Sequence, residues 1–221
     1  KAVLCKEFGP PESLVIGDIE PAAPGKGQVA VDMKAAGVNF ADSLIIQGKY
    51  QSKPAFPFSP GLEGAGIIRE AGEGVSGFKA GDRVMVHPMG GGAFSQDLVI
   101  DTSLVFPIPD AMDFVTAGGF FITYGTSHHA LKDRAQIQPG ETLVVLGAAG
   151  GVGLTAVELG KVMGARVIAA ASTDEKLDLC RKYGADETIN YSKEDLRDAI
   201  KALTDGKGAD VIYDPVGGPL A

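Results

Sequence analysis

The stretch LGAAGGVGLTAVELG, residues 146–160, decides the fold of the second half of the chain. It follows the apolar run TLVV and leads into a segment whose apolar residues recur at helical spacing. Ala148, Gly150 and Gly153 occupy the three positions of the G-x-G-x-x-G pattern, with Ala in the first. Gly150 lets the backbone approach a pyrophosphate, and Gly153 lets helix and strand pack closely. A strand before this turn and a helix after it predict a dinucleotide site rather than an unliganded turn.

The turn itself supplies the groups that would hold the phosphates. Backbone N–H groups at the start of a helix carry partial positive charge and bind phosphate oxygens. We therefore expect the pyrophosphate to lie against five consecutive residues, Ala149, Gly150, Gly151, Val152 and Gly153.

Short apolar strands alternate with helical patterns on both sides of this stretch. TLVVLGA, RVIAAAS, ETIN and ADVIYDP are typical of strands, and TAVELGKVMGA, EKLDLCRKYGA and EDLRDAIKALTDG are typical of helices. Such alternation predicts a parallel sheet of βαβ units. Ser192 and Asp195 predict a capping box at the start of the last of these helices.

The sequence before PIPDAM, residues 107–112, is β-rich instead. VAVDMKAAGV alternates apolar and polar residues with period two, and further short strands are separated by Gly, Pro and Asp. After the first of these strands comes AAGVNFAD, where Asn39 can cap a helix over 40–46 and Asp42 can bond back to its start. These residues alone leave open whether Asn39 only caps the helix or also faces a substrate.

The bulk properties exclude several classes of protein. The 221 residues carry a formal charge of −8, which argues against a broad surface for nucleic acid. No apolar run approaches a membrane span, and the first residues lack the apolar core of a secretory signal. Two cysteines, far apart in the sequence, cannot build a disulfide framework. We expect a cytoplasmic protein with no membrane partner.

The end of the second strand of the βαβ region indicates which dinucleotide binds. A site for NAD usually has an acidic residue there, which bonds the ribose hydroxyls. Here the strand ends Ala171-Ser172-Thr173, and the first acid is Asp174. Ser172 can donate to a phosphate oxygen and Lys176 supplies a positive charge nearby, so the sequence favours a 2′-phosphate and therefore NADPH.

Six motifs, in this order, resemble those of the zinc-free medium-chain dehydrogenase/reductases, and most closely the NADPH:quinone oxidoreductases related to zeta-crystallin. They are GVNFADxxxxxGxY, PGLEGAG, GDRV, HALKDRAxxxPGE, GAAGGVG and DPVGG. The resemblance implies a mixed α/β fold with a GroES-like, β-rich catalytic domain over 1–122. A Rossmann-type NADPH domain with a doubly wound parallel sheet would follow over 123–221, without the full set of strands that such a domain usually has. The active site would lie in the cleft between the two domains. It also implies a homodimer of a longer subunit, so we expect residues 1–221 alone to have weak or no turnover.

The same comparison argues against a metal. Zinc-dependent relatives have Cys-His-x-Asp where this chain has residues 39–42, and Gly-His-Glu where it has 61–63. Leu62 cannot bind zinc, an Asn amide is a poor ligand, and no cysteine lies between Cys5 and Cys180. Without a Lewis acid the acceptor must already be electrophilic, as a quinone or an activated alkene is.

The resemblance also implies roles for individual residues. Asn39 and Tyr50 would face the acceptor, Thr126 would lie beside the nicotinamide, and Tyr191 beside the adenosine phosphate. Quinone reduction is the first hypothesis. The second is reduction of α,β-unsaturated carbonyls or enoyl thioesters, with Tyr50 as proton donor. The third is an NADPH-binding protein without turnover, either a crystallin or an RNA-binding protein, although the net charge disfavours RNA.

Overall fold

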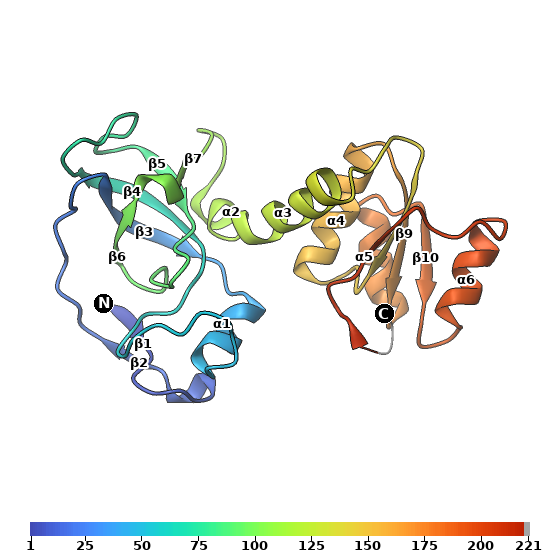
Figure 1. Ribbon diagram of the computed structural model, residues 1–221, viewed down its shortest axis with the longest axis horizontal. Helices are drawn as coiled ribbons and strands as arrows, with labels where there is room; N and C mark the ends of the chain where they lie inside the picture. The colour runs from blue at the N-terminus through green and yellow to red at the C-terminus, as the bar shows by residue number, and fades with distance from the viewer. Residues whose placement is uncertain (219–221) are drawn as a thin grey trace. The chain divides into compact units, whose positions relative to one another are not determined.

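The computed structural model describes residues 1–218, so the last three residues of the predicted second domain lie outside the described part (Figure 1). The chain divides into two compact units, residues 1–122 and 123–221. Each unit is built around its own sheet, antiparallel in the first and parallel in the second.

The first unit contains a five-stranded antiparallel sheet in the order β6-β3-β4-β5-β7. Its strands are β3 Gln28–Ala36, β4 Gly64–Ala71, β5 Arg83–Val86, β6 Asp97–Asp101 and β7 Val105–Pro107. Register shifts between β3 and β4, typical of bulges, interrupt the long central pair. Two further strands, β1 Ala2–Leu4 and β2 Val15–Gly17, pair separately. The alternation read from the sequence therefore gives the expected β-rich first half.

Short helices extend the loops of this unit. Helix α1 covers Phe40–Ile46, as predicted, and α2 covers Phe114–Gly118. Gly48 follows α1 with a φ of +66°, the left-handed conformation expected just past a helix end. Single 3-10 turns occupy Pro11–Ser13 and Thr102–Leu104.

The second unit contains a parallel sheet, of which the described residues form four strands in the order β10-β9-β8-β11. The strands are β8 Thr142–Leu146, β9 Arg166–Ala171, β10 Glu187–Asn190 and β11 Val211–Tyr213. Strands β9 and β10 lie on one side of β8, and β11 lies on its other side. The strand order therefore reverses beside β8, which is where open α/β sheets bind their ligands.

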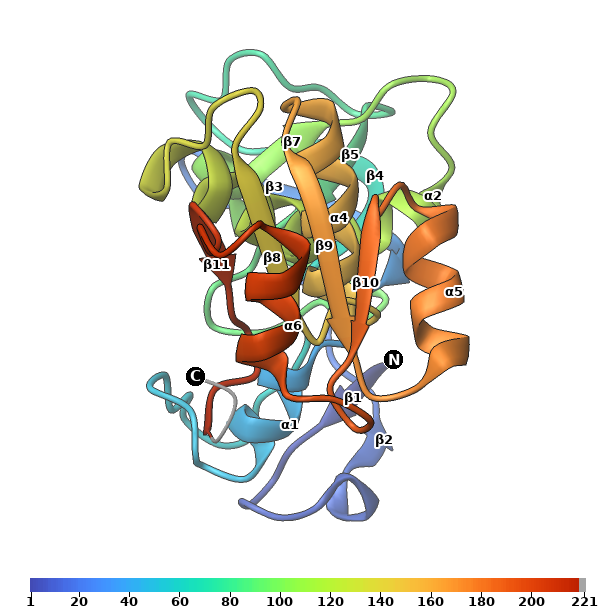
Figure 2. The ribbon, with the colours of Figure 1, turned by 90° about the vertical axis from the view of Figure 1, so that its right-hand side faces the viewer.

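Helices cover both faces of this sheet. One apolar cluster joins Leu143 and Val145 of β8 to helices α4 Gly151–Val162 and α5 Asp174–Lys182. A second cluster joins Val144 and Leu146 to α6 Leu196–Leu203. Because neighbouring residues of a strand point to opposite faces, α6 lies on the face opposite α4 and α5 (Figure 2). The sheet is therefore doubly wound, as predicted.

Two details differ from the sequence prediction. Ser192 lies in a turn, and α6 begins only at Leu196. Asp195 is the N-cap of α6, and its carboxylate accepts a hydrogen bond from the Asp198 N–H. The predicted Ser192–Asp195 capping box is therefore wrong, because Asp195 itself is the N-cap and accepts the N–H of the third helical residue. The segment HHALKDRAQI, residues 128–137, also favours a single helix that ends before Pro139 and Gly140. The structure instead has α3, Phe121–His128, followed by a π-helical turn over His129–Arg134.

Both cysteines are free thiols buried in apolar clusters. Cys5 packs with Ile45 and Phe58 in the first unit, and Cys180 packs with Val157 in the second. Burial raises the pKa of each thiol above its ordinary value.

A hydrogen bond between helices α3 and α4 gives the second unit a stability that depends on pH. The Tyr124 hydroxyl donates to the Glu158 carboxylate, which raises the pKa of Tyr124 from 10.0 to about 12. The folded-state pKa therefore exceeds the unfolded value, so this stabilisation is complete below pH 10 and is lost as the pH rises towards 12. We expect Tyr124→Phe to lower the free energy of unfolding at pH 7 by roughly 1–3 kcal/mol. Chemical unfolding at pH 7 and pH 11 checks this, since the difference between wild type and variant should shrink at the higher pH.

Candidate functional site

The glycine-rich turn between β8 and α4 has the geometry that the sequence predicts. Gly150 is the N-cap of α4 and donates its N–H to the Gly147 carbonyl at 2.9 Å. A Cβ atom at Gly153 would lie 2.4 Å from the Gly147 oxygen and 2.9 Å from the Ala148 Cα. Only a glycine therefore lets the helix approach the strand this closely, which is the role expected of the third glycine of the motif.

The start of α4 fits a phosphate group. Gly150 has no side chain that could cap the helix, and the structure shows no side-chain cap there. The first N–H groups of a helix have no partner within the helix, so they suit an anion. Of the five predicted cradle residues, Ala149 and Gly150 lie in the turn, and Gly151, Val152 and Gly153 form the first turn of the helix.

The end of β9 brings together the two residues predicted to hold a 2′-phosphate. The Lys176 ammonium donates to the Ser172 hydroxyl oxygen at 3.2 Å. That bond leaves the Ser172 O–H directed away from the ammonium, where it can donate to a phosphate oxygen.

The neighbouring acid is engaged elsewhere. Asp174 forms an ion pair with Lys193 at 2.5 Å and accepts from the Asn190 amide at 2.6 Å. The hydrogen bond from Lys193 is the main reason that the pKa of Asp174 is lowered. An acid held in this way is poorly placed to accept hydrogen bonds from the ribose hydroxyls, as the acid of an NAD site does. The arrangement is therefore consistent with the preference for NADPH that the sequence predicts.

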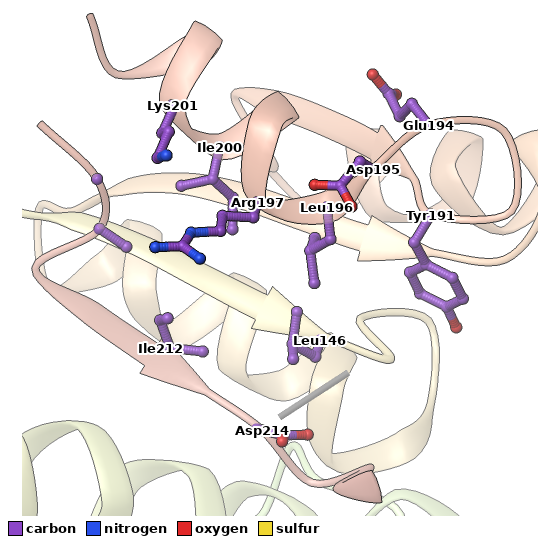
Figure 3. A pocket seen from close by; sticks show the side chains of 12 residues that line it. Leu146, Tyr191, Glu194, Asp195, Leu196, Arg197, Ile200, Lys201, Ile212 and Asp214 are labelled. Atoms are coloured by element: carbon purple, nitrogen blue, oxygen red, sulfur yellow. The ribbon is translucent and has the colours of Figure 1, made fainter. Parts of the chain in front are cut away.

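Tyr191 follows β10 and joins the same edge of the sheet. Its backbone N–H donates to the Ala171 carbonyl at 3.2 Å, which ties the end of β10 to the end of β9. Its side chain lines a pocket of about 610 Å³ between α6 and the strands (Figure 3). Tyr191 is the one predicted cofactor residue among the lining residues.

The rest of this pocket was not anticipated from the sequence. Its lining combines apolar side chains of the sheet and of α6 with charged residues of α6, of its N-terminal flank and of the segment after β11. The apolar ones include Leu146, Leu196, Ile200 and Ile212, and the charged ones include Arg197, Lys201, Asp195 and Asp214. The apolar spacing of α6 indicates the buried face but not the charges at its edge. The glycine turn, Ser172 and Lys176 are not part of the lining, so the predicted phosphate cradle is distinct from the pocket.

Asn39, in the first unit, is both a helix cap and one end of a partly buried chain of hydrogen bonds. It is the N-cap of α1, and its backbone N–H donates to the Asp42 carboxylate at 2.8 Å. Its side-chain amide donates through Nδ2 to Oε1 of Glu63 at 2.9 Å. The amide is thus already held by the protein on one side, which its sequence neighbours did not indicate.

Asp42 and Glu63 are both buried carboxylates. Asp42 also accepts from the Gly61 N–H at 3.2 Å, and burial is the main reason that its pKa is raised. Glu63 is 1% exposed, and its second oxygen accepts from the Ile122 N–H at 2.9 Å. Together they join α1 to the segment before β4 and to the start of α3.

Tyr50 and Leu62 lie in the first unit, and Thr126, the third residue predicted to be catalytic, lies in the second. Tyr50 is partly buried and packs against the cluster of Cys5, Ile45 and Leu62. Leu62, at the position of a zinc-binding histidine in the metal-dependent relatives, is 5% exposed and belongs to that apolar core. Thr126 is exposed on α3 in the second unit.

His87 was given no role from the sequence, yet it supports the same segment. Its Nδ1 lies 2.8 Å from the Leu62 carbonyl oxygen, so Nδ1 carries the proton and donates. Its ring stacks on Phe121 with the centroids 4.6 Å apart. No local pattern could have found this contact, because the partners are 25 residues or more apart.

Within residues 1–218, no group of three or more His, Cys, Asp or Glu side chains could hold a metal ion. Across the same range, no helix combines the length and the apolar character that crossing a membrane requires.

Comparison with known proteins adds the family. The model of the alcohol dehydrogenase GroES-like domain matches residues 25–110, and that of the zinc-binding dehydrogenases matches residues 151–221. A quinone oxidoreductase-like protein 2 homolog from Nematostella vectensis is 42% identical over 222 residues, covering 100% of this chain and 60% of that protein.

Solved structures agree. A probable oxidoreductase from Mycobacterium abscessus is 39% identical with a TM-score of 0.91, covering 98% of this chain and 68% of that one. The quinone oxidoreductase of Escherichia coli, solved in complex with NADPH, is 36% identical with a TM-score of 0.93 and coverages of 99% and 67%. The chain belongs to the quinone oxidoreductase family of the medium-chain dehydrogenase/reductases. Membership confirms the predicted fold class, with the antiparallel sheet as the GroES-like part of this quinone oxidoreductase fold and the parallel sheet as its Rossmann-type part.

Length distinguishes the chain from its quinone oxidoreductase relatives. It spans about three-fifths of the curated quinone oxidoreductase-like proteins that it matches, 60% of one and 62% of another.

Proposed function

We propose that this chain forms the larger part of an NADPH-dependent reductase that transfers a hydride to a quinone without a metal ion. The observation that carries the proposal is the Ser172–Lys176 pair beside an acid that Lys193 already holds. It favours a phosphorylated dinucleotide, and the relative from Escherichia coli was solved with NADPH. The cradle Ala149, Gly150, Gly151, Val152 and Gly153 would hold the pyrophosphate, and Tyr191 would lie beside the adenosine phosphate.

The residues around Asn39 suit an apolar, electrophilic acceptor. Val38 and Phe40 flank Asn39 in the sequence and are 84% and 81% exposed, so they offer apolar surface to a flat ring. Residues 39–42 and 61–63 lack the Cys and His ligands that zinc-dependent relatives have there, and Leu62 is packed in the core. An acceptor bound here must therefore accept a hydride without a Lewis acid, as a quinone does.

The chain's own residues would bind the acceptor and stabilise the charge that develops on it. NADPH, when bound, supplies the hydride, and one further proton completes the hydroquinone. Glu63 accepts one N–H of the Asn39 amide, and we assign the second to an acceptor carbonyl oxygen, which gains negative charge as the hydride arrives. Tyr50 offers a second hydrogen bond, and Thr126 lies beside the nicotinamide in this proposal. We also propose a cytoplasmic homodimer of the full-length subunit.

A panel of acceptors tests the function, using the full-length protein that contains this chain. NADPH oxidation is followed with a benzoquinone, a 2-alkenal and a crotonyl thioester. We expect kcat/KM for the quinone to exceed the others by at least about tenfold, a difference of about 1.4 kcal/mol in transition-state stabilisation. A preference for the alkenal or the thioester would contradict the proposal. Tight NADPH binding with no acceptor reduced would instead favour a binding protein without turnover.

Tyr50→Phe in the same assay separates quinone reduction from the enoyl reductase alternative. A tyrosine that only positions the acceptor should lose less than about tenfold in rate, the worth of one neutral hydrogen bond. A general acid should lose roughly 10²- to 10⁴-fold. Because Tyr50 packs against an apolar cluster, we expect the smaller loss with the quinone.

A further inference from the structure

Glu63 is a buried carboxylate whose two oxygens each accept one N–H. Oε1 accepts from the Asn39 side chain and Oε2 from the Ile122 backbone, both at 2.9 Å. Its side chain has no ion pair among the described residues. Burying such a group without a cation is costly unless hydrogen bonds compensate for the lost water. A residue that only linked two loops would not need to be acidic.

The backbone around Glu63 leaves space for the carboxylate. A Cβ atom at Gly37 would lie 2.4 Å from Glu63 Oε1 and 2.8 Å from the Gly118 oxygen. The loop between β3 and α1 therefore passes directly against the carboxylate. His87 fixes the carbonyl of the preceding residue, Leu62, at 2.8 Å. The position of the carboxylate is thus set from several sides.

Both carboxylate oxygens of Glu63 act as acceptors in the structure, and this determines which way the Asn39 amide faces. The amide must present Nδ2 to Glu63, since its Oδ1 would meet a second acceptor. The backbone of Asn39 is held as well, through its N–H bond to Asp42 at 2.8 Å. The side chain therefore has one orientation in which both Glu63 and the rest of the cap are satisfied.

We propose that Glu63 is a positioning residue that fixes the orientation of the Asn39 amide, so that its second N–H is directed to the carbonyl oxygen of the acceptor. The role rests on the proposed function, because it assumes that Asn39 contacts the acceptor. Glu63 itself touches neither the acceptor nor the cofactor in this scheme. Its effect is to make the amide a donor rather than an acceptor at the reacting oxygen.

Glu63→Gln in the full-length protein tests this. Glutamine keeps the shape but replaces one acceptor with an NH₂ group, so Asn39 must turn its Oδ1 to the new donor or lose the bond. We expect kcat with benzoquinone to fall roughly 10- to 100-fold, the effect of one misplaced buried hydrogen bond, while the Kd for NADPH stays within about twofold. Glu70→Gln, at an exposed glutamate on β4, is the matched control and should leave kcat unchanged.

A double variant distinguishes positioning from a structural role. In Glu63→Gln with Asn39→Asp, the glutamine NH₂ can donate to the new carboxylate, so the buried pair is complementary again. We expect the melting temperature to recover towards the wild-type value while kcat stays low, because residue 39 no longer has an N–H to donate. Recovery of both, or a kcat for Glu63→Gln within about twofold of wild type, would overturn the proposal.

Two further measurements keep the outcome decisive. If Glu63→Gln does not fold, Glu63→Asp takes its place, because aspartate keeps both acceptor oxygens but withdraws them by one methylene. This variant should lower kcat without changing the Kd for NADPH, and an unchanged kcat would overturn the proposal.

If the wild-type protein reduces no quinone, the proposed function fails, yet the orientation can still be followed by the side-chain amide NMR signal of Asn39. That signal should move in Glu63→Gln and not in Glu70→Gln; a signal unmoved by Glu63→Gln would contradict the positioning role.

Discussion

Gly153→Ala is expected to weaken NADPH binding by about 100-fold and to lower the free energy of unfolding by about 1–3 kcal/mol. The added methyl group would lie 2.4 Å from the Gly147 oxygen, 2.9 Å from the Ala148 Cα and 3.0 Å from the Ala148 carbonyl carbon. All three are backbone atoms, so no side chain can rotate away, and α4 must move from β8. The N–H groups at the start of α4 move with it, and each bond to a charged phosphate contributes roughly 1.5–3 kcal/mol.

Isothermal titration with NADPH and chemical unfolding measure the two effects. Gly125→Ala is the control for stability, because Gly125 lies in helix α3 and a Cβ there would meet nothing within 4 Å. That change should leave stability unchanged or raise it by up to about 1 kcal/mol, as alanine favours helix. A Gly153→Ala protein that binds NADPH as tightly as wild type would show that this turn is not the phosphate site.

Replacing both Ser172 and Lys176, as Ser172→Ala with Lys176→Met, is expected to reduce NADPH affinity by about 10- to 150-fold. That range corresponds to the roughly 1.5–3 kcal/mol that a hydrogen bond to a charged group contributes. The affinity for NADH should stay within about twofold, because NADH lacks the 2′-phosphate that these side chains would contact. The variant should therefore lose its preference between the cofactors.

Binding constants for the two cofactors, measured at one fixed salt concentration, check this expectation, since exposed charges are screened by salt. Lys182→Met is the matched control, because Lys182 lies in the last turn of the same helix, α5, and is exposed. It removes the same charge from the same helix without touching Ser172. Equal affinities of the wild-type protein for NADPH and NADH would refute the assignment of both residues.

Local patterns were enough to predict much of this structure. The glycine spacing over 147–153 predicted a strand, a turn and a helix, and Gly153 fits where that pattern requires it. Asn39 and Asp42 predicted a capped helix over 40–46, which is the range observed. Such features depend on residues within a few positions of one another, so they can be recognised without knowing any tertiary contact. Their proposed roles in binding stay predictions.

The parts that sequence reasoning missed depend on contacts over long separations. Glu63 lies 24 residues from Asn39 and 59 from Ile122, and its burial follows from the packing of a loop rather than from any periodicity. The pocket beneath α6 likewise combines residues that lie in or directly after three different strands, β8, β10 and β11. The Ser192 error had a local cause, since two possible caps competed and the later one, Asp195, was used.

The burial of both cysteines has a consequence for the proposed reduction of quinones. A quinone is an electrophile that also adds to thiolates, forming an aryl thioether, and the thiolate is the reactive form. Cys5 and Cys180 are each 0% exposed, and burial raises the pKa of both thiols. Neither thiol therefore presents a nucleophile to a quinone, and under the proposed function both cysteines would be protected from arylation.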